Sequence, residues 1–381
     1  MKLLPMLLIA ISMALFAPAA DAHKPSDSYL TVERAGRTLR GQWDIALRDL
    51  DAAIGLDANG DGEITWGEVR AKAPEITAYA LSRLDVRSGG QPCALRATST
   101  LVDRHTDGAY AVLALAGDCP SDAPTLSVRY GLLFDIDPQH RGLMQYIERD
   151  ASRSVVFAVD RPLQVVGGES GGAIEQFLTY AHEGVWHIWL GFDHILFLLS
   201  LLLPAVLVRA HAAWEPAPSF RRAFVDVARV VTAFTVAHSI TLSLAALGVV
   251  ALPSRWVESA IALSVVLAAA NNLRPIVKES RWIAAFAFGL IHGFGFAGAL
   301  QDLGLPRGSL ALSLFGFNVG VEAGQLALVA LFLPIAFLVR ATGLYRRVAL
   351  VSGSAVIAAI AAVWLFERAF DVPVFAAFAS Q

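Results

Sequence analysis

The stretch VWHIWLGFDHILFLLSLLLPAVLV, residues 185–208, decides the fold of the C-terminal half of this chain. Its only charged side chain is the carboxylate of Asp193. A helix needs about 20 consecutive apolar residues to cross the roughly 30 Å hydrocarbon core of a bilayer. The stretch therefore predicts a membrane-spanning helix.

Five more apolar stretches follow the first one along the chain. One of them, residues 308–339, is too long for a single straight span, and its glycines at positions 316, 320 and 324 suggest a tilted or broken helix. We therefore predict an all-α membrane domain of six transmembrane helices over residues 182–381. The five further stretches are residues 230–252, 256–273, 282–301, 308–339 and 348–366.

Composition separates this C-terminal part from the rest of the chain. Hydrophobic residues make up 56% of the 381 residues and charged residues only 17%. Residues 182–381 hold 23 Asp, Glu, Lys and Arg, against 40 in residues 1–181. This asymmetry indicates a polar N-terminal domain before a membrane domain. It excludes a disordered chain, an ordinary cytosolic enzyme and a basic nucleic-acid binder, so no nucleic-acid partner is expected.

Residues 1–22 have the pattern of a secretory signal peptide, with Lys2 before an apolar run and Ala20-Asp21-Ala22 at the cleavage site. An uncleaved anchor is the alternative, but the apolar run, residues 3–16, is too short to span a bilayer. Cleavage after Ala22 would make His23 the N-terminal residue. Its amine and imidazole could then chelate a divalent metal, or it could be an ordinary terminal residue.

Orientation follows from the positions of Lys and Arg between the predicted spans. With residue 23 outside, the inner loops contain nine of these cations besides Arg229 at the edge of the second span, and the outer loops and tail contain three, which satisfies the positive-inside rule. We expect a multi-pass protein of a bacterial inner membrane, with the N-terminal domain on the periplasmic side and the C-terminus outside. The inner cations are Arg209, Arg221, Arg222, Arg274, Lys278, Arg281, Arg340, Arg346 and Arg347.

Short segments rich in β-forming residues, separated by turn residues, fill the exported part. We predict a mainly β domain over residues 23–175, interrupted by a helical insertion at about residues 66–84. The only cysteines, Cys93 and Cys119, would form a disulfide in an oxidising compartment, with a reactive thiol pair as the alternative. The expected strands are residues 28–33, 38–47, 94–101, 110–115, 125–134 and 154–159.

Residues 57–68, DANGDGEITWGE, match the calcium-binding loop of an EF-hand at positions 1, 3, 5, 6, 8 and 12. Gly62 allows the sharp turn, and Ile64 is expected to point into the core. A degenerate Asp/Gly-rich turn is the alternative. We predict modest Ca²⁺ affinity, because no second EF-hand is visible. The oxygen ligands would come from Asp57, Asn59, Asp61, the Glu63 carbonyl, Thr65 and Glu68.

Polar residues at membrane depth are expensive and usually face a partner or a pathway. In the first span, His187, Gly191 and His194 are spaced i, i+4 and i+7, so they would share one helical face beside Asp193. Any single histidine could merely hydrogen-bond a neighbouring helix, but acidic and imidazole groups on four spans together suggest a metal site. The remaining candidate ligands are His238, His292, Asn318 and Glu322.

This ligand set suits Ni²⁺, Co²⁺, Zn²⁺, Fe²⁺ or Mn²⁺. The spans contain neither cysteine nor methionine, which disfavours a Cu⁺ or Ag⁺ pathway. Enzymatic motifs are weak: His182 and His187 are one residue too far apart for HExxH, and no GxxxxGK[ST] motif is present. We therefore expect no enzyme and assign no catalytic residue.

Four motifs give the chain a resemblance to the HupE/UreJ family of membrane proteins, in its longer branch with an exported domain. They are HIWLGFDHILF, FTVAHSITL, FGLIHGFGFA and FNVGVEAGQL, beginning at residues 187, 234, 288 and 317. Shorter members are associated with nickel or cobalt uptake and carry a proline after the first histidine, where this chain has Ile188. The resemblance implies transport of nickel or cobalt.

A divalent metal permease is thus the favoured hypothesis, with uptake as the direction. His187 would receive the ion, and Asp193, His194, His238 and His292 would hold it at mid-depth. Asn318 and Glu322 would complete this site or relay protons. The alternatives are a calcium- or metal-binding sensor without transport and a membrane enzyme that uses a bound metal. A homo-oligomer is compatible with the sequence.

Overall fold

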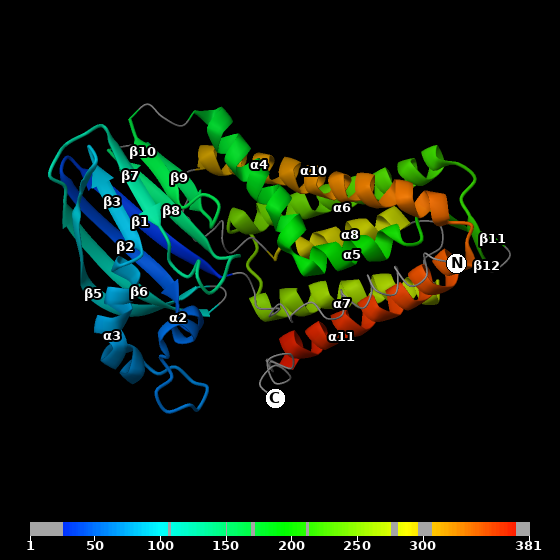
Figure 1. The fold of residues 1–381 in the computed structure, drawn as a ribbon, viewed down its shortest axis with the longest axis horizontal. Coiled ribbons are helices and arrows are strands. Elements are labelled where there is room, and N and C mark those ends of the chain that lie inside the picture. Colours follow the sequence, from blue (N-terminus) through cyan, green and yellow to red (C-terminus); the bar gives the residue numbers. More distant parts are fainter. Residues whose placement is uncertain are drawn as a thin grey trace.

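A computed structural model describes residues 26–105, 108–149, 151–168, 172–210, 213–275, 281–295 and 307–370. The predicted signal peptide and His23 lie outside the described residues. A mainly β domain, here called the head, lies at one end of a helical bundle (Figure 1). This arrangement confirms a β-rich N-terminal region before a helical C-terminal region.

Two sheets build the head. Their neighbours run in the orders β5-β6-β2-β1-β8-β9 and β10-β7-β3-β4. All pairings are antiparallel except that of β1 with β8, which is parallel. The strands are β1 (Asp27–Ala35), β2 (Thr38–Ala46), β3 (Leu84–Ser88), β4 (Gln91–Pro92), β5 (Ala94–His105), β6 (Gly108–Asp118), β7 (Thr125–Tyr130), β8 (Arg141–Glu148), β9 (Ala151–Phe157) and β10 (Leu163–Gly167).

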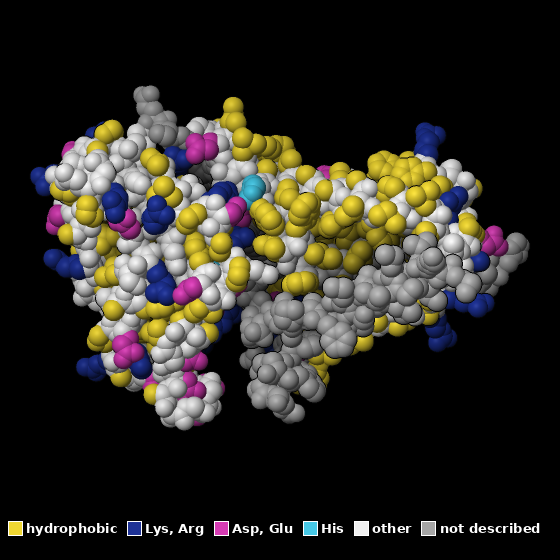
Figure 2. All heavy atoms as spheres, in the orientation of Figure 1, with side chains coloured by type: hydrophobic (Ala, Val, Ile, Leu, Met, Phe, Trp, Pro, Cys, Tyr) yellow, Lys and Arg dark blue, Asp and Glu magenta, His cyan; other side chains and the backbone are white. Residues whose placement is uncertain are grey.

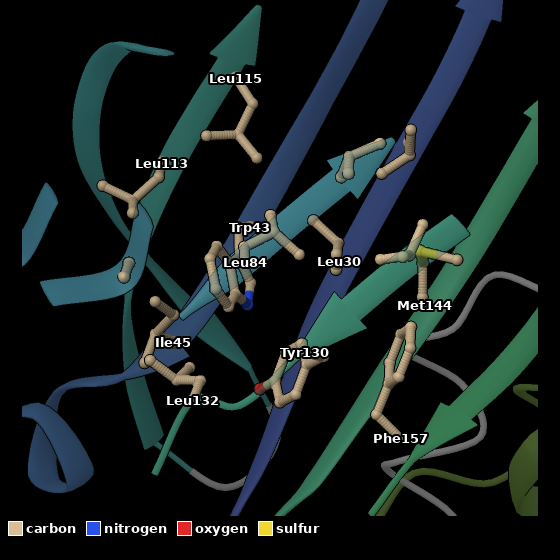
Figure 3. Packing of buried hydrophobic residues seen from close by; sticks show 14 of the residues in the cluster. Leu30, Trp43, Ile45, Leu84, Leu113, Leu115, Tyr130, Leu132, Met144 and Phe157 are labelled. Atoms are coloured by element: carbon tan, nitrogen blue, oxygen red, sulfur yellow. The ribbon is translucent and has the colours of Figure 1, made fainter. Parts of the chain in front are cut away.

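One apolar core lies between these sheets (Figure 3). Leu30 and Trp43 from the larger sheet pack in the same cluster as Val128 and Tyr130 from the smaller one. Every predicted strand overlaps an observed strand, but β3, β4, β8 and β10 were missed. The missed β8 is central, because it pairs with β1 through contacts more than 100 residues apart in sequence.

The predicted disulfide between Cys93 and Cys119 is confirmed. It joins the segment between β4 and β5 to the residue that follows β6, across a sequence separation of 26 residues. Closing a loop of this length restricts the unfolded chain and typically stabilises a domain by about 2–4 kcal/mol. The bond therefore holds the edge of the larger sheet against the smaller one.

Helices make up the described bundle, apart from a small hairpin at the end far from the head (Figure 1). The hairpin is formed by β11 (Leu207–Ala210) and β12 (Ala213–Pro216). We call this end of the bundle head-distal. The helices are α4 (Ala173–Leu190), α5 (Phe192–Leu202), α6 (Phe220–Ala246), α7 (Ser254–Leu273), α8 (Arg281–His292), α10 (Arg307–Val339), the π-helical turn η1 (Tyr345–Ser352) and α11 (Gly353–Phe370).

Four described helices are long and apolar enough to cross a membrane, and the bent pair α4 and α5 would make a fifth span. The prediction of six spans is not confirmed, because helix α8 has only 12 residues and ends at His292. Residues 296–301, the last part of that predicted span, lie outside the described part. Hydrophobic side chains cover the bundle surface, whereas charges gather on the head and at the head-distal end (Figure 2). The chain is a membrane protein of several spans.

Helix α10 is one unbroken helix from Arg307 to Val339, so of the two alternatives from the sequence the broken helix is wrong and the tilted helix stays a prediction. Its glycines have a different role. A Cβ atom at Gly316 would lie 2.7 Å from the Phe177 carbonyl oxygen, and one at Gly320 would collide with the carbonyl of Ala181. These glycines let α10 touch the backbone of α4, as small residues do between membrane helices.

The first predicted span is broken at Gly191, where α4 and α5 meet at an angle of 72°. His187 and His194 therefore do not share one helical face, contrary to the sequence interpretation. Asp193 explains the break locally, because its Oδ1 accepts a hydrogen bond from the His194 backbone N–H at the start of α5. A Cβ at Gly191 would lie 2.7 Å from the His187 carbonyl oxygen, so the bend needs glycine.

Candidate metal centre

Four imidazoles from four helices form one connected group inside the bundle. His187 lies in the last turn of α4, His194 in the first turn of α5 and His238 within α6, and His292 ends α8. The ring of His187 lies 4.5 Å from that of His194 and 6.3 Å from that of His238, measured between centroids. His194 is 5.3 Å from His292. The bend at Gly191 brings the rings of His187 and His194 together although the two residues belong to different helices.

Asp193 fixes the tautomer of His194. Its Oδ1 lies 2.9 Å from the ring Nδ1, and an ionised carboxylate can only accept a hydrogen bond. Nδ1 therefore carries the proton, and Nε2 presents a lone pair. This Nε2 atom is buried and has no hydrogen-bond partner. A carboxylate behind an imidazole is the usual outer support of a metal-ligating histidine.

Ser264 of α7 fixes the tautomer of His292 in the same way. Its single hydroxyl proton is directed at the carbonyl oxygen of Ile261, 2.6 Å away. The Ser264 oxygen must then accept from His292 Nε2–H, at 2.8 Å. The lone pair of His292 is consequently on Nδ1, which is buried and has no partner.

His238 is fully buried, and neither of its ring nitrogens has a hydrogen-bond partner. One nitrogen of a neutral imidazole is a donor and the other an acceptor. Leaving a buried polar group without a partner costs about 1–3 kcal/mol, so such groups need an explanation. A ligand of the imidazole would supply one.

The polar residues of α10 are placed differently from the histidines. Asn318 donates from Nδ2 to the Leu314 carbonyl oxygen, and its Oδ1 is buried without a partner. Glu322 accepts a hydrogen bond from Thr232 of α6, 3.0 Å away. The structure thus joins Glu322 to α6 through a hydroxyl and not through a histidine. Helix α10 approaches the imidazoles through Phe317, whose ring is 5.3 Å from that of His187.

The candidate residues lie as neighbouring pairs in the described part of the chain, but no three His, Cys, Asp or Glu side chains there are placed to hold one ion. The arrangement is a loose group of buried nitrogens supported by Asp193 and Ser264. Sequence reasoning missed Ser264, because a serine in an apolar helix carries no ligand signal.

Comparison with protein-family models identifies a match to the description HupE / UreJ protein over residues 166–368, just over half of the chain. The chain belongs to the HupE/UreJ family. This family is a membrane transporter-type family associated with nickel and cobalt. No curated protein matches the chain.

The HupE/UreJ match covers the described bundle except the last two residues of α11, and it begins beyond most of the head. The head is nonetheless fastened to the bundle by ion pairs. Glu183 of α4, one turn before His187, is buried and pairs with Arg141 at 3.4 Å and with Arg161. The head therefore contacts the same helix that presents His187. Sequence reasoning missed Glu183, although its four-residue spacing from His187 was a usable signal.

The predicted calcium loop lies in the head of this HupE/UreJ protein, between α2 (Leu47–Ile54) and α3 (Trp66–Leu81). Asp57 accepts hydrogen bonds from the backbone N–H groups of Gly60 and Gly62, which fold the loop around its carboxylate. Glu68 closes the loop by accepting from Ala58 N–H and Thr65 N–H. These backbone bonds, led by those from Gly62 and Thr65, lower the pKa of Asp57 and of Glu68 respectively.

Proposed function

We propose that this HupE/UreJ protein is a permease for a divalent transition metal, with nickel or cobalt as its cargo. The observation that carries the proposal is the set of buried imidazole nitrogens on His194, His238 and His292 that lack a protein partner. Three such groups within one cluster are difficult to explain as packing alone, because each lost hydrogen bond destabilises the fold.

The donor chemistry supports a borderline metal. Neutral imidazole nitrogen suits Ni²⁺, Co²⁺ and Zn²⁺, and Asp193 would offset part of the cation's charge. Sulfur ligands are missing, because both cysteines form the disulfide of the head and the methionines lie at positions 1, 6, 13 and 144. The same donor set disfavours Cu⁺.

Binding would draw the imidazoles together, since the described residues hold them as adjacent pairs. His187 is the ligand on the helix that contacts the head, so it would receive the ion first. Asn318 would offer its Oδ1, and Glu322, held by Thr232, would relay protons between α10 and α6. We propose uptake, with the head on the periplasmic side of an inner membrane.

The test is metal accumulation by cells that produce the wild type or a variant in matched amounts. We expect His194→Ala and His238→Ala to reduce uptake of ⁶³Ni²⁺ or ⁵⁷Co²⁺ to the level of cells without the protein. His182→Ala is the matched control, because this histidine lies on α4 outside the cluster and is 40% exposed. Equal uptake of Ni²⁺, Co²⁺, Zn²⁺, Fe²⁺ and Mn²⁺ by wild type and His194→Ala would reject the permease.

A Ca²⁺ ion bound in the loop of residues 57–68 is a second proposal, supported by the helix–loop–helix context and by three carboxylates, of which Asp61 is exposed and Asp57 and Glu68 are half-buried. We propose that it stiffens the head. The competing function is a calcium or metal sensor without transport, which the ion pairs from the head to Glu183 favour. A sensor predicts that Glu68→Gln abolishes a downstream response while metal uptake stays at background in every variant.

A further inference from the structure

Each of three buried histidines has a phenylalanine one helical turn away on its own helix. Phe197 follows His194 in α5, Phe234 precedes His238 in α6, and Phe288 precedes His292 in α8. Helix α5 leads toward the β11–β12 hairpin, whereas α6 and α8 run from the hairpin end toward the head (Figure 1). All three phenylalanines therefore lie on the head-distal side of their histidines.

The three phenyl rings lie next to one another and next to the imidazole of His292. Phe197 lies 5.3 Å from Phe234 and 5.7 Å from Phe288, in edge-to-face geometry with the latter. The ring of His292 is 4.9 Å from Phe197 and 5.2 Å from Phe234. Phe197 and Phe234 are each only 2% exposed. We call these residues the phenylalanine layer, and His194, His238 and His292 the histidine layer.

Beyond the phenylalanine layer, toward the head-distal end, the described residues leave only a small cavity with mostly apolar walls. Leu198, Val227 and Val231 line a cavity of about 10 Å³ there, with Asp226 and Arg281 at its wall. A cavity needs about 10–15 Å³ to hold a single water molecule. A hydrated cation cannot pass through such a space.

We propose that Phe197, Phe234 and Phe288 form a hydrophobic gate that closes the head-distal side of the histidine layer. Hydrophobic constrictions gate ion pathways by excluding water, because an ion cannot enter them without losing its hydration shell. This inference rests on the proposed permease function for its physiological meaning. As a physical seal between the histidines and the head-distal end it can be tested without any metal.

The backbone contacts indicate which helix must move to open the gate. Gly289 of α8 has no room for a Cβ atom, which would lie 2.5 Å from the Phe234 carbonyl oxygen and 2.9 Å from the Ala237 Cβ. Helices α6 and α8 are thus in close backbone contact at Gly289. Helix α5 is separated from α4 by the 72° bend at Gly191. Rotation of α5 about this bend would move Phe197 away from Phe234 and Phe288 and so open the phenylalanine layer.

The gate is tested with a cysteine reporter in place of Ser264, which contacts His292 from α7. The only native cysteines form the disulfide of the head, so the reporter is the single free thiol. A membrane-impermeant cationic thiol reagent is applied from the head-distal side of vesicles whose orientation is checked by protease access to the head. We expect slow labelling when the three phenylalanines are intact.

Removing a ring should open the path. We expect Phe234→Ala, and separately the less buried Phe288→Ala, to raise the labelling rate by about tenfold or more, a barrier change of about 1.4 kcal/mol. Phe224→Ala is the matched control, because this residue lies on α6 but is 45% exposed on its outer side. Its labelling rate should equal that of the reporter alone. Gel filtration and melting temperature show which variants remain folded.

Two results would overturn the gate: fast labelling from the head-distal side with all three rings intact, or unchanged labelling in folded Phe234→Ala and Phe288→Ala. Both are independent of metal transport. If His194→Ala leaves metal uptake unchanged, the permease proposal fails, yet the labelling experiment still decides whether the phenylalanine layer is a seal. If uptake requires His194 but labelling contradicts the layer, only the gate is lost.

Discussion

His140 in the head and His238 in the bundle are both fully buried, but their surroundings differ completely. His140 Nδ1 contacts Ser26 Oγ at 2.5 Å, and its Nε2 contacts the Tyr130 hydroxyl at 2.7 Å. Neither ring nitrogen of His238 has a partner. The difference teaches that burial alone does not separate a structural histidine from a candidate ligand. What separates them is whether the two ring nitrogens have hydrogen-bond partners in the protein.

The hydrogen bonds of His140 belong to a larger network of buried polar side chains in the head. The Tyr130 hydroxyl is 2.6 Å from Ser28 Oγ, and Trp43 Nε1 donates to Ser28 as well. Burial raises the pKa of Tyr130 and lowers that of His140 to about 3, so both side chains are neutral at physiological pH. A neutral, fully bonded network of this kind specifies a core and leaves no site for a ligand.

The largest expected effect is the contrast between two substitutions. His140→Leu should lower the free energy of unfolding of the head by about 2–4 kcal/mol, because it removes the buried hydrogen bonds of the imidazole with Ser26 and Tyr130. His238→Leu should change the stability of the bundle by less than about 1 kcal/mol or increase it, since no bonded partner is lost. Melting temperatures in detergent measure both. Equal destabilisation by the two variants would remove the distinction between them.

Whether the sequence can separate a structural histidine from a candidate ligand depends on where in the chain its hydrogen-bond partners lie. The histidines of the bundle were found because apolar spans make any imidazole conspicuous, and the break at Gly191 was missed because helical spacing was assumed to continue through a glycine. His140 was not singled out, and its partners Ser26 and Tyr130 belong to the strands β1 and β7 or their edges. Such contacts arise from sheet pairing at long range, which local patterns do not encode.

The strands and helices show the same limit: local patterns do not encode contacts between distant parts of the sequence. Strands β1, β2, β5 and β6 were predicted because each is a local run of β-forming residues bounded by turns. Strand β8 was missed, although it is central, because its parallel pairing with β1 is set by the fold and not by a hairpin. The glycines of α10 were noticed, but their role required knowing that α4 lies against them.

Metal addition should sharpen the comparison by acting on one region only. Ni²⁺ or Co²⁺ at about 100 times its Kd would stabilise the bundle by about 2.7 kcal/mol if binding is confined to the folded state. Hydrogen–deuterium exchange of peptides from α5 and α6 should slow, whereas peptides from β1 and β8 should not change. His238→Leu should abolish the effect. Slower exchange in the head, or none anywhere, would contradict a metal centre in the bundle.

Acidification should act on the head through His140. The pKa of this histidine is about 3 in the folded head, lowered mainly by burial, and 6.5 in an unfolded chain. Between these values the unfolded state binds more protons, so stability is complete above pH 6.5 and falls as pH decreases toward 3. The slope approaches about 1.4 kcal/mol per pH unit.

That slope is measured by hydrogen exchange of β1 and β8 peptides between pH 7 and 5, corrected for the intrinsic exchange rate. His140→Leu provides the control, since a chain without this imidazole should lose the contribution and show a flatter profile. A wild-type head whose protection is as constant with pH as that of the variant would show that His140 takes up its proton without unfolding.

The smallest expected effect concerns Ca²⁺ and the loop of residues 57–68. An isolated EF-hand with a Kd of about 10⁻⁴–10⁻³ M would stabilise the head by only about 0.4–1.4 kcal/mol at 1 mM Ca²⁺. Glu68→Gln should remove this gain, whereas Glu63→Gln should retain it, because residue 63 would contribute only its backbone carbonyl. Differential scanning fluorimetry with and without Ca²⁺ measures the shift. A gain that survives Glu68→Gln would place the ion elsewhere and leave the loop as a turn held by its own backbone bonds.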